Sequence, residues 1–104
     1  MKYKVEISKE IQDIVPVFLE EFDKNVKLLE QAIDSQDYET IRSITHKIKG
    51  SAGGYGFHQI SEYSKVIENL AKNRSPIEQI QNQFKKMIDY YHNMEIIYTN
   101  KPLT

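Results

Sequence analysis

The chain has 104 residues, of which 39% are apolar and 28% are charged. A chain of this length holds a single hydrophobic core, so we predict one domain spanning residues 1–104. Lysine and arginine (14) nearly balance aspartate and glutamate (15), and a formal net charge of −1 gives no overall field to attract nucleic acid or an anionic membrane. The lack of cysteine excludes disulfides, thiolate nucleophiles and cysteine-ligated zinc.

The sequence predicts a soluble, cytoplasmic protein. Residues 1–10 lack the continuous apolar stretch of a secretory signal, and no segment approaches the roughly 18 apolar residues of a membrane-spanning helix. The absence of cysteine fits a reducing compartment. The same composition is compatible with a domain excised from a longer protein.

In the first third of the chain, apolar residues recur in steps of three and four, the spacing of one helical face. Pro16 lacks a backbone N–H and crowds the preceding turn, so we expect it to separate a short helix near 8–15 from a long helix over 16–34. Ser35 or Asp37 is then expected to cap the next helix. The apolar residues of this stripe are Ile11, Ile14, Val15, Phe18, Phe22, Val26, Leu29 and Ile33.

Three more amphipathic helices are predicted, over 37–53, 57–73 and 76–98. Glycine readily adopts the left-handed conformation that ends a helix, so Gly53, Gly54 or Gly56 should stop the first of them. For the last, the sequence Ser75-Pro76-Ile77-Glu78 predicts a capping box with proline at the first helical position. The inward residues are Tyr38, Ile41, Ile44, Ile48 and Ala52, then Phe57, Ile60, Tyr63, Ile67, Leu70 and Ala71, then Ile77, Ile80, Phe84, Met87, Ile88 and Tyr91.

These elements predict an all-α fold. We find no segment with the strict alternation of a half-buried strand. Four long amphipathic helices with short connections are typical of an up-down-up-down antiparallel four-helix bundle, here with a short additional N-terminal helix.

The segment around His46 carries the clearest sign of function. With successive residues about 100° apart around a helix axis, the apolar residues of the 37–53 helix face inward and His46 faces water. Arg42, Lys49, Gly50 and Gly53 fall on the same outward side. Glycine inside a helix costs about 1 kcal/mol relative to alanine, and the simplest reason for Gly50 is close access to the imidazole by another protein. Lys49 can place its ammonium beside a phosphoryl group on the ring.

The residues His46, Lys49, Gly50 and Ser51, followed by Gly56 and Phe57, resemble the phosphorylation motif of histidine-containing phosphotransfer (HPt) domains of multistep two-component phosphorelays. The resemblance implies that His46 accepts a phosphoryl group from an aspartate of a response-regulator receiver domain, and that Lys49 stabilises this group. Arg42, Gly50 and Gly53 would face the partner.

The resemblance also implies a phosphoprotein that relays phosphoryl groups between receiver domains, with a hybrid sensor kinase as a further possible partner. It implies no cofactor of the chain's own, because the receiver supplies magnesium. We expect no enzyme activity, since no P-loop or glycine-rich kinase loop marks an ATP site.

The sequence leaves other interpretations of the function open. The chain could bind a receiver or another signalling protein independently of phosphorylation, or serve a purely structural role, for which His46 would be buried. A zinc site is the hypothesis with the least support. It would require His46, His58 and His92 to converge, with no closely spaced histidine pair to begin it.

Overall fold

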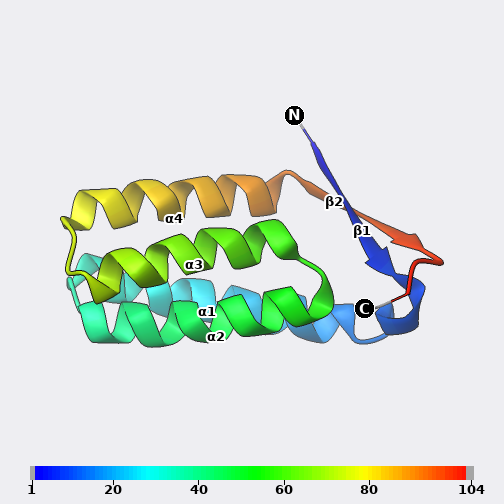
Figure 1. Ribbon diagram of the computed structural model, residues 1–104, viewed down its shortest axis with the longest axis horizontal. Coiled ribbons are helices and arrows are strands. Elements are labelled where there is room, and N and C mark those ends of the chain that lie inside the picture. The colour runs from blue at the N-terminus through cyan, green and yellow to red at the C-terminus, as the bar shows by residue number, and fades with distance from the viewer. Residues whose placement is uncertain (1, 103–104) are drawn as a thin grey trace.

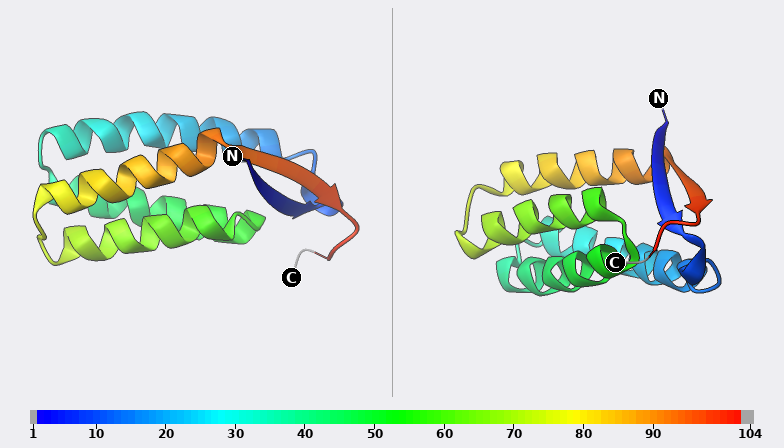
Figure 2. Two further views of the ribbon diagram at one scale, coloured as in Figure 1. Left: turned by 90° about the horizontal axis from the view of Figure 1, so that it is seen from above. Right: turned by 45° about the vertical axis from the view of Figure 1, so that its right-hand side comes forward.

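The computed structural model describes residues 2–102. Four long helices lie alongside one another as a bundle, and a small two-stranded sheet lies at one end of it (Figures 1 and 2). The predicted four long helices and helical bundle are therefore confirmed. None of the helices described within residues 2–102 is long and apolar enough to cross a membrane. The elements are β1 (Tyr3–Ser8), α1 (Val15–Asp34), α2 (Tyr38–Tyr55), α3 (His58–Lys72), α4 (Ile77–His92) and β2 (Met94–Thr99).

The predicted short helix over 8–15 is wrong. The chain instead forms strand β1, followed by a single 3₁₀ turn at Lys9–Ile11. In β1 the buried Val5 and Ile7 are separated by the exposed Glu6. This is the period-two pattern of a strand with one buried face, so the prediction that no segment shows this alternation is wrong.

The predicted last helix, over 76–98, is too long. Helix α4 ends at His92, and β2 then pairs in parallel with β1, from Tyr3 opposite Met94 to Ser8 opposite Thr99 (Figure 1). The apolar residues of β2 extend the pattern of α4, so local spacing does not reveal the change. The partner strand at the other end of the sequence decides it, because a strand needs a neighbour to bond its backbone.

Two predicted helix boundaries are confirmed by their hydrogen bonds. Asp37 caps α2, since its carboxylate accepts hydrogen bonds from the backbone N–H of Thr40 at 3.1 Å and from the Thr40 hydroxyl at 2.6 Å. Gly56 ends α2 with φ of +96°, and Phe57 N–H donates to the Ala52 carbonyl at 2.8 Å. Together these form the glycine-terminated helix end expected from the sequence.

The start of α4 differs from the prediction. Pro76 lies at the cap position before the helix rather than inside it, and no side chain caps the helix there. The capping box between Ser75 and Glu78 is therefore not formed. A second difference lies before α1, where Ile14 is 45% exposed although its spacing predicted burial. Ile14 is the N-cap residue of α1, so the helical periodicity does not extend to it.

The core fixes how α2 is rotated. Phe18 of α1 stacks on Phe57 at a ring-centroid distance of 4.7 Å, and Ile41, Ile48 and Ala52 of α2 are almost completely buried. A helix that buries one face must present the opposite face to solvent. The outward face of α2 carries the candidate site.

Candidate functional site

His46 lies on the exposed side of α2, as predicted. Its side chain is 70% accessible to solvent, whereas Ile44 and Ile48, two residues to either side, point into the core. This exposure argues against the purely structural role, for which a buried His46 would have been the mark.

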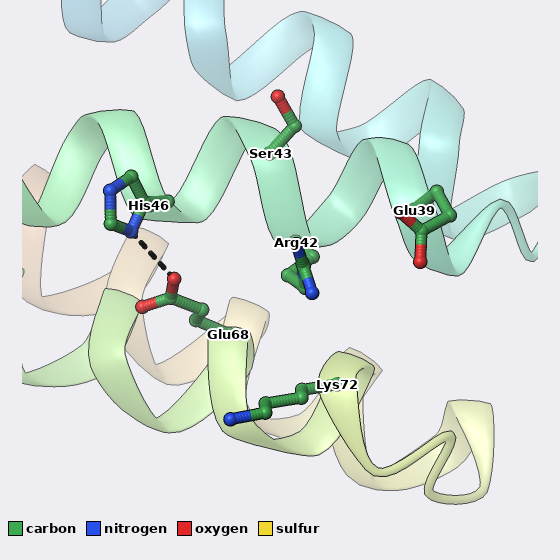
Figure 3. Close-up of a pocket in the computed structure, with 6 residues that line it drawn as sticks. All are labelled: Glu39, Arg42, Ser43, His46, Glu68 and Lys72. Atoms are coloured by element: carbon green, nitrogen blue, oxygen red, sulfur yellow. Dashed lines mark hydrogen bonds and ion pairs between the residues drawn. The ribbon is translucent and has the colours of Figure 1, made fainter.

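The imidazole of His46 is held by a carboxylate from the neighbouring helix. Nδ1 of His46 lies 2.7 Å from Oε2 of Glu68 on α3 (Figure 3). An ionised carboxylate only accepts hydrogen bonds, so the ring proton resides on Nδ1 and that nitrogen donates. In the neutral ring, Nε2 then carries the free lone pair. The contact thus orients the ring and leaves Nε2 as its nucleophilic atom.

Glu68 also binds the cation predicted to act with His46. The Lys49 ammonium donates a hydrogen bond to Oε1 of Glu68 at 2.8 Å. Only 16% of the Glu68 side chain is exposed. Burial raises the pKa of Glu68, but the hydrogen bonds and charges of Lys49 and His46 together outweigh burial and lower it. Glu68 is therefore ionised near neutral pH, which both contacts require.

Further contacts between α2 and α3 help to hold His46, Lys49 and Glu68 in position. The Ser61 hydroxyl of α3 donates a hydrogen bond to the Lys49 carbonyl of α2 at 2.9 Å. A Cβ on Gly53 would lie 3.4 Å from the Ser61 Oγ, an ordinary van der Waals distance. Gly53 therefore lies at the contact between the two helices, and its role toward a partner stays a prediction.

Gly50 differs from Gly53 because nothing packs against it. A Cβ built there would have no neighbour within 4 Å, and Gly50 lies one helical turn beyond His46 on the exposed side of α2. Packing within the chain therefore does not require glycine. This fits the predicted role of Gly50 as clearance for a partner, which remains to be tested.

A shallow depression of about 590 Å³ opens beside His46, between α2 and α3. Figure 3 shows the side chains of Arg42 and Lys72 on the two sides of this depression, one from each helix. They add two cations to the lining that also contains the Glu68 carboxylate. The lining residues are Glu39, Arg42, Ser43, His46, Glu68 and Lys72.

Glu68 is the residue of the site that the sequence interpretation missed. Its signal was a polar stripe of Ser61, Ser64 and Glu68, in steps of three and four, beside the apolar stripe of α3. The stripe predicts polar side chains near a helix contact. Which of them meets His46 depends on the rotation and offset of α3 against α2, and these follow from packing of the whole bundle.

The other two histidines lie at helix ends, His58 at the start of α3 and His92 at the end of α4. Within residues 2–102, no three His, Cys, Asp or Glu side chains form a group that could hold a metal ion. The hypothesis of a zinc site therefore has no support in the part of the chain that the structure describes.

Comparison with known families agrees with this geometry. A family model described as the Hpt domain matches residues 13–93, which contain all four helices and His46. The chain belongs to the Hpt domain family, whose members are phosphocarrier modules of two-component systems. The resemblance seen in the sequence is thereby confirmed. Searches of the curated proteins and of the solved structures found no significant match.

Proposed function

We propose that this chain relays a phosphoryl group between aspartates of response-regulator receiver domains and carries it on Nε2 of His46. The observation that supports this most is the contact between Nδ1 of His46 and Glu68, because it leaves Nε2 unbonded on an exposed ring. Membership of the Hpt family supports the same reaction.

The proposed transfer needs no other group from this chain as a nucleophile. The lone pair of Nε2 attacks the phosphorus of the receiver's aspartyl phosphate, the P–N bond forms, and the bond from phosphorus to the aspartate oxygen breaks. The aspartate leaves as a carboxylate. The ring retains its proton on Nδ1, and the adjacent Glu68 carboxylate offsets the positive charge that develops on the imidazole.

Lys49 is proposed to stabilise the phosphoryl oxygens. It lies one turn beyond His46 on α2, and its ammonium is already close to the ring because both groups bind Glu68. A charge-assisted hydrogen bond from ammonium to phosphoryl is strong. Magnesium would come with the receiver domain. Reversal of the same steps would pass the group to a second receiver.

The partner is proposed to approach over Gly50 and Arg42. The open space at Gly50 lets a second protein reach Nε2, and Arg42 supplies a cation at the edge of the depression. The short connections between successive helices support the up-down-up-down order of the bundle, which would place α2 and α3 side by side at this surface.

The test is to incubate the chain with a phosphorylated receiver and magnesium and to measure acid-labile, base-stable phosphate. We expect label on the wild type, none on His46→Gln, and full label on His58→Gln, a matched control at the exposed histidine of α3. With magnesium and ATP alone we expect no label. Binding of receivers without label on the wild type, across a panel, would instead support a phosphorylation-independent binding module.

A further inference from the structure

Helices α1 and α4 form one face of the bundle, and α1 contacts α4 less than it contacts α2. Near the C-terminal end of α4 the Tyr91 hydroxyl donates a hydrogen bond to Asp23 at 3.0 Å, and the rings of Phe22 and Tyr91 lie 4.5 Å apart. Two depressions are lined by residues of both helices. Together they form a groove along the α1–α4 face.

The floor of this groove is apolar. It consists of two adjoining depressions of about 650 Å³ and 310 Å³ that share Glu30, Phe84 and Lys85. Val26, Phe84 and Ile88 line it and are only half-buried. In a closed four-helix bundle such residues would be covered by the facing helix. Here a strip of apolar surface stays accessible along the groove.

The rim of the groove is acidic. The carboxylates of Asp23, Glu30, Asp34 and Asp89 line it, and the basic side chains in the lining are those of Lys85 and His92. None of these four carboxylates forms an ion pair with a cation in the described part of the chain. The chain as a whole is nearly neutral, so this excess of negative charge is a local property of the α1–α4 face.

We propose that the α1–α4 groove binds a basic amphipathic helix of a partner protein. An apolar floor between two helices fits the apolar face of a third helix, and an acidic rim fits lysine or arginine on its flanks. The groove shares no lining residue with the depression beside His46. A partner held there would leave His46 open to a receiver domain.

The charges of the groove disfavour a second copy of this chain as the occupant. A two-fold symmetric dimer through this face would bring one acidic rim against the other, since both copies use the same surface patch. Like charges brought together across an interface oppose association. The proposal therefore commits to a basic segment of a different protein.

The experiment uses the full chain and two fluorescent helical peptides with the same leucine pattern, one carrying lysine and the other glutamate at all remaining positions. We expect the lysine peptide to bind, by fluorescence anisotropy, with an affinity that falls as salt is added. The glutamate peptide should bind at least about tenfold more weakly. NMR titration of ¹⁵N-labelled chain should shift amides of α1 and α4 along the groove.

The variant Glu30→Lys/Asp34→Lys should lower the affinity for the lysine peptide at least about tenfold. Two carboxylates that attract the peptide's lysines are replaced by ammonium groups that repel them. The matched variant Glu6→Lys/Glu62→Lys makes the same charge change away from the groove and should bind as the wild type does. Equal weakening by both variants, equal binding of both peptides, or shifts confined to α2 and α3 would overturn the proposal. So would a concentration-dependent dimer that buries the α1–α4 face. Phosphoryl transfer to His46 is measured separately, so either proposal can fail alone.

Discussion

Glu68 of α3 joins the His46 imidazole and the Lys49 ammonium of α2 through its two carboxylate oxygens, at 2.7 Å and 2.8 Å. One half-buried carboxylate thus orients both side chains proposed to act on the phosphoryl group. Removal of this carboxylate should therefore alter the protonation of the His46 ring while the fold is retained.

We predict that Glu68→Ala shifts the neutral His46 ring away from the form protonated on Nδ1, because the acceptor that selects this form is lost. Two-dimensional ¹⁵N–¹H NMR of the imidazole nitrogens measures this. Phosphoryl transfer from a receiver should slow by about ten- to a hundredfold, the range found when a residue that orients a metal-ligating histidine is removed. Glu62→Ala, on the exposed side of the same helix, is the control. A wild-type ring protonated on Nε2 would contradict the assignment.

The lowered pKa of Glu68 predicts a pH dependence of stability. Burial raises this pKa, but the contacts with Lys49 and His46 lower it overall. A carboxylate with a lowered pKa in the folded state stabilises the fold above its ordinary value of 4.5 and loses this effect as the pH falls through the lowered pKa.

The neutral variant Glu68→Gln should therefore be less stable than the wild type at pH 7, and the difference should shrink as the pH falls below 4.5 and disappear in stronger acid. Urea unfolding at a series of pH values measures the two free energies. A difference that stays constant down to strong acid would show that the charge of Glu68 contributes nothing to stability.

Gly50 and Gly54 allow a matched test of whether Gly50 gives a partner protein access to His46. A Cβ at either position meets nothing within 4 Å. Gly50→Gln and Gly54→Gln should both keep the fold and raise the free energy of unfolding by up to about 1 kcal/mol, since glycine is a poor helix former. Only Gly50→Gln, one turn from His46, should slow phosphoryl transfer. Equal rates of phosphoryl transfer in the two variants would contradict the prediction that Gly50 provides access for the partner.

The strands are predicted to be integral to the domain, although the family match begins after β1. Ile7 is 1% exposed, and its side chain would lie 3.4 Å from a Cβ at Gly56. Ile7→Ala should lower the free energy of unfolding by about 2–5 kcal/mol, the range for truncating a buried isoleucine. Glu6→Ala, on the exposed face of β1, should change it little. Chemical denaturation of both variants measures the effect.

The sequence predicts the helices better than the ends of the chain. Regular steps of three and four locate the inward residues of α1 to α4. Local capping chemistry narrows the start of α2 to Ser35 or Asp37 and its end to Gly53, Gly54 or Gly56, and the structure selects Asp37 and Gly56. The strands were missed because each is stabilised by the other, across nearly the whole sequence. For the same reason the motif at His46 predicted the exposed ring but not Glu68, whose position depends on how α3 packs against α2.

The parallel pairing of the first strand with the last has a consequence for the order of folding. Each helix, and each contact between successive helices, closes a short loop, whereas the sheet closes almost the whole chain into one loop at a larger entropic cost. We expect the helices to assemble first and the two strands to join afterwards. Pulse-labelling hydrogen exchange during refolding should then protect the amides of Ile48 and Ile67 before those of Val5 and Ile97, whose N–H groups face the partner strand in this register.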